Sequence, residues 1–149
     1  ELTMIQDSIK MTGELRITVT NPEGDITQET VVPNLVVTSG KDFIAERMKD
    51  ATTSVMSHMA IGTGSTAAAA GDTALCTEAG RVSLTSTTVT ANAVAYVATF
   101  GAGTGTGALT EAGLFNASSS GDMLCRTVFS VINKGAADTL GITWTVTVN

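Results

Sequence analysis

The sequence has few of the residues that enzymes most often use for catalysis or metal binding. Its 149 residues include one histidine, two cysteines and two prolines. A metal site built from several histidines of one chain is therefore excluded, and a histidine base would have to be His58. Ser and Thr occur along the whole chain, but no nucleophile, base and orienting acid form a pattern. The sequence predicts no catalytic residue, no metal site and no cofactor, and therefore no enzyme.

Charged residues are also scarce, at 15% of the chain, where about a quarter is usual. The net charge is −6, and the basic residues are scattered except for a group at 41–49 that is interleaved with acids. Nucleic-acid binding needs clustered Lys and Arg, and a membrane-spanning helix needs about 20 consecutive apolar residues. The sequence contains neither, so we expect no nucleic acid and no membrane among the partners. The residues shown, which begin at Glu1, also lack the pattern of a secretion signal.

Two glycine-rich runs have to be interpreted either as nucleotide-binding loops or as connectors. Gly62–Ala67 matches the dinucleotide pattern GxGxx(G/A), which requires a helix directly after it. An Ala run bounded by Gly follows instead, with no βαβ unit around it. Gly101–Gly107 has no Lys to reach a phosphate. We predict that both runs are surface loops. Cys76 and Cys125 could form a disulfide, although two free thiols are the commoner arrangement.

Alternation of apolar residues with threonine is what the sequence has in abundance. Leu140–Val148 carries an apolar side chain at nearly every second position and mostly Thr between them. Successive side chains of a strand point to opposite faces, so this segment has one apolar and one hydroxyl face. The same alternation predicts a hairpin over 14–32, with a Pro- and Gly-containing turn at 21–25. Further strands are predicted at 56–61, 81–90, 93–100 and 123–132.

One helix is predicted near 39–50, with Ser39 as its N-cap and Asp42 reaching back to that cap. Its narrow apolar stripe suits a position over an edge or one end of a sheet. The fold class that follows is all-β: an antiparallel β-sandwich or jelly roll of about seven or eight strands with this one short helix. We expect a single domain over 13–149, preceded by an N-terminal arm at 1–12.

Two side-chain predictions concern the interior and the surface. Trp144 and Tyr96 are expected to fill the core, with their polar ends hydrogen-bonded locally. Glu78, Glu111 and Arg81 are expected to form an ion pair across surface loops, which would contribute about 0–1 kcal/mol.

Several segments have a familiar order and content. They are Val32–Met48, Met59–Ala67 with Ala70–Leu75, Ala108–Asn116, and the closing alternation that ends at Val148. This order resembles small virion structural proteins of tailed bacteriophages. The resemblance implies a β-rich particle component made in many copies, and a jelly-roll cement or decoration protein of the outer capsid fits the size and strand number. The AIGTG and TEAGLFN stretches within these segments also resemble phage tail-collar and fibre proteins, so a tail, collar, baseplate or fibre-associated protein is the alternative.

The partners implied by the resemblance are the major capsid protein and further copies of the chain itself. The implied location is the outer capsid surface, after synthesis in the host cytoplasm. The arm and the loops at 62–74 and 101–107 are predicted to contact neighbouring subunits, because small residues allow close backbone approach and strand addition. The predicted contact residues are Glu1, Leu2, Met4, Ile5, Thr63, Ser65, Ala68, Ala69, Thr104 and Thr106. The alternative is that these loops are solvated and contact no partner. A sugar-binding or enzymatic sandwich is a third possibility, which the sequence supports poorly.

Overall fold

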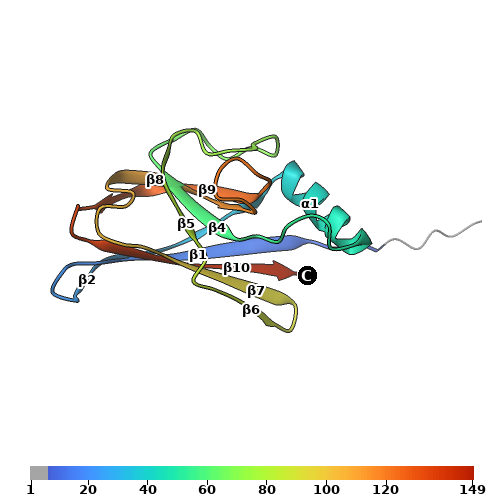
Figure 1. Ribbon diagram of the computed structural model, residues 1–149, viewed down its shortest axis with the longest axis horizontal. Helices are drawn as coiled ribbons and strands as arrows, with labels where there is room; N and C mark the ends of the chain where they lie inside the picture. Colours follow the sequence, from blue (N-terminus) through green and yellow to red (C-terminus); the bar gives the residue numbers. More distant parts are fainter. Residues whose placement is uncertain (1–6) are drawn as a thin grey trace, which may run out of the picture.

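The computed structural model describes residues 7–149 as two antiparallel five-stranded sheets that form a β-sandwich (Figure 1). The first sheet has the strands β2 (Ile26–Pro33), β1 (Met11–Thr20), β10 (Thr139–Val148), β7 (Ala93–Phe100) and β6 (Ser86–Thr90), in that order. The second sheet has the order β3 (Leu35–Val36), β9 (Met123–Lys134), β8 (Gly107–Phe115), β4 (His58–Gly62) and β5 (Glu78–Ser83). The predicted all-β antiparallel sandwich is confirmed, with ten strands in the described residues instead of seven or eight.

The core follows directly from the apolar alternation of β1 and β10. The two strands pair along their whole length, from Met11 opposite Val148 to Thr20 opposite Thr139. The inward apolar side chains at 15–19 and 140–146 are fully or almost fully buried, and the threonines between them lie on the outer face. Full burial of one such apolar side chain contributes about 1.5–3 kcal/mol. The largest member of this core is Trp144.

The helix α1 (Thr38–Lys49) exists where it was predicted, but its predicted N-cap is wrong. The cap residue is Val37, and no side chain caps the helix. Ser39 Oγ instead donates a hydrogen bond to the carbonyl oxygen of Met123, 2.8 Å away. At Gly40 an added Cβ would lie 2.1 Å from the Leu124 carbonyl oxygen. The first turn of α1 is therefore packed against the backbone of β9, and this contact takes the hydroxyl that sequence reasoning assigned to the cap.

Other boundaries differ because the chain changes sheets at places that have no strong turn signal. The segment 81–90, predicted as one strand, is divided between β5 and β6. At the change, Leu84 N donates to Ser57 O and Thr85 N to Val97 O. The strands β3 and β8 were not predicted separately. Of the predicted arm, residues 11 and 12 belong to β1, and residues 1–6 lie outside the described part of the chain.

Two further features of the arrangement position the candidate sites. Helix α1 lies at the same end of the sandwich as the C-terminus (Figure 1). The segment 63–77, which joins β4 to β5, lies over the outer face of the second sheet, at the top of the view. This segment, named the covering loop here, and the α1 end of the sandwich are the two regions where side chains outside the main core gather.

Candidate functional site

A buried ion pair lies beneath the covering loop, on the outer face of the second sheet. Glu111 comes from β8 and Arg126 from the neighbouring β9. Arg126 Nε and Nη2 donate to Glu111 Oε1 at 3.2 and 3.1 Å, and neither residue has any exposed surface. Strand pairing places Arg126 opposite Gly113, the next residue of β8 on this face after Glu111. The pair is thus fixed by the register of two adjacent strands.

Glu111 also binds the covering loop through three backbone donors. The amides of Gly64, Cys76 and Thr77 donate to its carboxylate at 2.6, 2.8 and 2.8 Å. Burial by itself would raise the pKa of the Glu111 carboxyl, but these three donors and Arg126 outweigh burial and hold that pKa below its usual value. The carboxylate therefore stays ionised and acts as an internal anion around which both ends of the loop are fixed.

Arg126 holds the middle of the same loop. Its Nη1 donates to Asp72 Oδ2 at 2.9 Å, and its Nη2 donates to the Thr66 carbonyl oxygen at 2.9 Å. Nη2 also lies 3.2 Å from the sulfur of Cys76. Burial would lower the pKa of Arg126, but the carboxylates of Glu111 and Asp72 reverse that effect and raise it. One buried guanidinium thus ties three separate points of the covering loop to the sheet.

The glycines of the G-T-G segment have a structural explanation that does not involve a nucleotide. An added Cβ at Gly64 would lie 2.2 Å from Glu111 Oε2, and one at Gly62 would lie 2.2 Å from the Thr77 carbonyl oxygen. The amide that could have faced a phosphate already donates to Glu111. No helix follows the segment. The prediction of a loop is confirmed for residues 63–74, whereas Gly62 is the last residue of β4.

Replacement of Gly64 by alanine tests this packing. We expect the Gly64→Ala variant to lose about 1–3 kcal/mol of unfolding free energy, because the new methyl group overlaps the Glu111 carboxylate. Gly71→Ala is the matched control in the same loop, since no atom lies within 4 Å of its added Cβ. The control should be neutral or slightly stabilising. Urea denaturation followed by Trp144 fluorescence gives both values, and equal losses would contradict this account.

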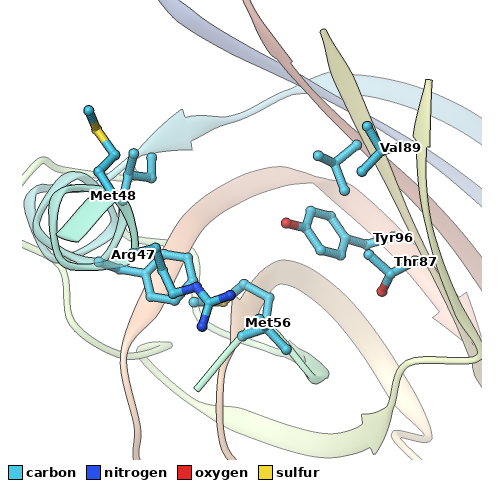
Figure 2. Close-up of a pocket in the computed structure, with 10 residues that line it drawn as sticks. Arg47, Met48, Met56, Thr87, Val89 and Tyr96 are labelled. Atoms are coloured by element: carbon cyan, nitrogen blue, oxygen red, sulfur yellow. The ribbon is translucent and has the colours of Figure 1, made fainter. Parts of the chain in front are cut away.

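An apolar groove lies at the α1 end of the sandwich, between the helix and the β6–β7 hairpin, with a volume of about 460 Å³. It is lined by Phe43, Ile44, Arg47 and Met48 of α1, by Val55 and Met56, and by Thr87, Val89, Val94 and Tyr96 of the hairpin. Figure 2 shows Tyr96 pointing from its strand toward the helix. Burial and the nearby Cys125 raise the pKa of Tyr96 to about 12, so its hydroxyl stays neutral. Met48, Val55 and Val89 are 83%, 55% and 68% exposed, which leaves the groove open to a partner.

The lone histidine is hydrogen-bonded by hydroxyl groups. His58 Nδ1 lies 2.8 Å from Ser57 Oγ, and Nε2 lies 3.3 Å from Ser83 Oγ. A hydrolytic triad needs a carboxylate or similar group to orient the histidine, and both ring nitrogens here face serines. Among residues 7–149 no three His, Cys, Asp or Glu side chains lie together in a way that could hold a metal ion.

The structure describes six of the ten predicted contact residues and places them in two loops that are hydrogen-bonded to the rest of the chain. Thr63, Ser65, Ala69 and Thr106 are exposed, Ala68 and Thr104 are half-buried, and Glu1, Leu2, Met4 and Ile5 lie outside the described residues. The 101–107 loop is held by hydrogen bonds from Gly103 N to Ala136 O, at 2.8 Å, and from Lys134 Nζ to Gly101 O, at 2.9 Å. Contact with neighbouring subunits remains a prediction for all ten residues.

Three side-chain predictions had different outcomes. Arg81 does pair with Glu78, at 2.7 Å, but Glu111 does not join them, because it is buried with Arg126. Trp144 fills the core as expected, whereas its Nε1 has no hydrogen-bond partner in the described structure, so the expected local bond is wrong. Both cysteines are free, Cys76 exposed and Cys125 buried.

Sequence reasoning missed the Glu111–Arg126 centre, although a signal for it was present. Each of the two charged residues stands within an apolar run, in EAGLF and LCRTVF. A charge in a strand whose neighbours are buried requires a partner of opposite sign.

Comparisons with known proteins gave no match: no family model, no curated protein and no solved structure is similar to this chain. No helix in residues 7–149 is long and apolar enough to cross a membrane. The functional proposal below therefore depends on the resemblance of the sequence segments described above and on their geometry.

Proposed function

We propose that the protein is a structural component of a tailed-bacteriophage virion. In this proposal it is a capsid cement or decoration protein that binds the major capsid protein and further copies of itself on the outer shell. Its task is mechanical: it buries surface across the seams between subunits and catalyses no reaction. A tail, collar, baseplate or fibre-associated position is the alternative.

The observation that supports a virion role, in either of these two forms, is the position of the two stretches that resemble phage tail-collar and fibre proteins. AIGTG covers the end of β4, and TEAGLFN covers most of β8, and these two strands are hydrogen-bonded neighbours. Ile61 lies opposite Ala112 and Gly62 opposite Glu111. The Glu of one stretch then accepts a hydrogen bond from the last Gly of the other, at 2.6 Å. The two stretches are 46–56 positions apart in the sequence, but they lie side by side in the second sheet and are hydrogen-bonded to one another. This arrangement is expected if the resemblance reflects a common way of building the sheet.

Surface composition gives further support. The chain carries a net charge of −6, which disfavours contact with packaged DNA. Several large apolar side chains are nevertheless exposed, and Met48, Val55 and Val89 among them line one groove. Exposed apolar residues that gather in patches are typical of surfaces that bind another protein. A standard stable interface buries about 1,200–2,000 Å² in total, about half of it on each partner, and the accessible surface of this chain is 8040 Å².

The copy number per particle tests the proposal and separates its two forms. Virions of the phage that encodes the chain are purified, and the chain is quantified against the major capsid protein by peptide mass spectrometry. A cement protein is expected in a fixed ratio close to that of the capsid subunit, and its addition to shells that lack it should raise their melting temperature. A few copies per particle would favour the tail or collar alternative. Absence from purified particles would refute both.

A further inference from the structure

The two sheets end in four edge strands, and three of these are protected against pairing with another chain. The edge β2 carries the charged Glu29, ends in Pro33 and has a register shift against β1. The edge β5 carries Glu78 and Arg81 and has a register shift against β4. The edge β3 has only two residues. Charges, proline, irregular register and short length are the devices by which proteins protect sheet edges.

The fourth edge, β6, has none of these devices. Its sequence Ser-Thr-Thr-Val-Thr is rich in β-branched residues, and all five residues are exposed. Its register with β7 is regular from Ser86 opposite Val97 to Thr90 opposite Ala93. No charged residue occurs anywhere between Arg81 and Glu111. Within residues 7–149, this edge therefore presents unpaired backbone groups along an uncharged strand of regular register.

We infer that β6 is a self-association edge, at which a second copy of the chain pairs antiparallel about a two-fold axis at Thr88. Two copies that each carry a net charge of −6 repel one another, and the repulsion is weakest where both surfaces are uncharged. Pairing about Thr88 sets Thr88 opposite its own copy and Thr87 opposite Val89 of that copy. The arrangement is isologous and joins two five-stranded sheets into one of ten strands.

The apolar groove beside β6 supplies the area that strand pairing alone lacks. Five paired residues extend over about 17 Å, and their backbone contact falls short of the roughly 800 Å² per partner of a stable interface. Thr87 and Val89 face the groove, so the two-fold axis brings the grooves of both copies together on one face of the joined sheet. Val55 and Met48, both largely exposed in one copy, then become available for cross-copy contact. This inference rests on the proposed function, because it identifies the surface through which copies of the chain contact one another in the proposed assembly.

Charge substitutions at the centre of β6 test the inference on the purified chain. Thr88→Glu and Thr88→Lys are each compared with the wild type by sedimentation velocity, alone and as an equimolar mixture. Each variant places like charges opposite one another and should raise the dissociation constant of the dimer roughly tenfold or more. The mixture should recover the dimer, because Glu then faces Lys. Thr99→Glu and Thr99→Lys on β7, also exposed, are the matched controls and should leave the dimer unchanged.

A cross-link provides a second measurement that does not depend on affinity. In a Cys76→Ser background, Thr88→Cys should form a disulfide between copies on mild oxidation, because Cα atoms across an antiparallel pair lie about 4.5–5.5 Å apart. Thr99→Cys should not. A monomeric wild type, a dimer that survives both charges at position 88, or a mixture that stays monomeric would each overturn the inference. A monomeric wild type would be expected if a strand of a different protein used this edge. None of these outcomes bears on the copy number in particles, so the two proposals fail separately.

Discussion

Replacement of Arg126 by methionine should lower the free energy of unfolding by about 3–5 kcal/mol. Methionine fills much of the same volume, but it leaves the Glu111 carboxylate in a site with no solvent exposure and without its cation. The three backbone amides still bind that carboxylate, whereas Asp72 and the Thr66 carbonyl oxygen lose their donor. Urea denaturation with Trp144 fluorescence as the probe measures the loss.

The matched control for this prediction is the exposed ion pair of the first sheet. Arg16 and Glu29 bridge β1 and β2 with side chains that are 57% and 46% exposed. Arg16→Met should therefore cost only about 0–1 kcal/mol. The Arg126 variant should also speed amide hydrogen exchange in the covering loop, at Gly64 and Cys76 among others. If both methionine variants lost the same small amount, the buried pair would not be what holds the loop.

Much of the sandwich could be predicted because its two central strands have a pattern that only a half-buried strand satisfies. In β1 and β10, the apolar residues recur at every second position and threonine fills most of the places between them. A one-residue slip in the β1–β10 register would move all apolar residues of the slipped strand to the outer face, so the apolar pattern determines the register. The hairpin turn was equally clear, since Pro22 and Gly24 stand where a turn requires them, and Gly24 has a φ of +90°.

The strands with weaker patterns were placed less well, for an identifiable reason. In β8 both faces are covered, one by the first sheet and one by the covering loop, so its residues from Glu111 to Phe115 are all buried and do not alternate. A strand covered on both sides cannot be distinguished by periodicity alone. The division of 81–90 between two sheets was likewise invisible, because Leu84 and Thr85 form no recognisable turn and are fixed only by bonds to distant residues.

The candidate sites depended even more on tertiary structure. Glu111 and Arg126 are 15 positions apart and meet only because β8 and β9 pair in one register. A sequence shows that each charge needs a partner, but it does not show which one. The groove arises from the position of α1, and the β6 edge is exposed because no sixth strand of the described residues lies beside it; both are properties of the whole sandwich. The sequence does contain one signal for this edge that was not used in the prediction, because residues 82–110 carry no charge.

The second large effect is expected at Trp144, the largest side chain with no exposed surface. Trp144→Ala should lower the free energy of unfolding by about 3–5 kcal/mol, because it leaves a cavity between the two sheets. This variant removes the only tryptophan, so circular dichroism replaces fluorescence as the probe of urea unfolding.

Trp144→Phe distinguishes the packing of the indole from its polar group. The indole Nε1 is buried and has no acceptor in the described structure, which costs about 1–3 kcal/mol relative to a bonded donor. Phenylalanine removes that unpaired donor and keeps most of the apolar contact with the core. Removal of the unpaired donor offsets part of the cost of the lost volume. We therefore expect the free energy of unfolding to fall by less than about 1.5 kcal/mol, which is the usual limit for hydrophobic exchanges that keep most of the volume. If the phenylalanine variant were as unstable as the alanine variant, this account would be contradicted. The indole N–H would then have to donate a hydrogen bond that phenylalanine cannot replace, and Trp144 would stabilise the sandwich by that bond as well as by packing.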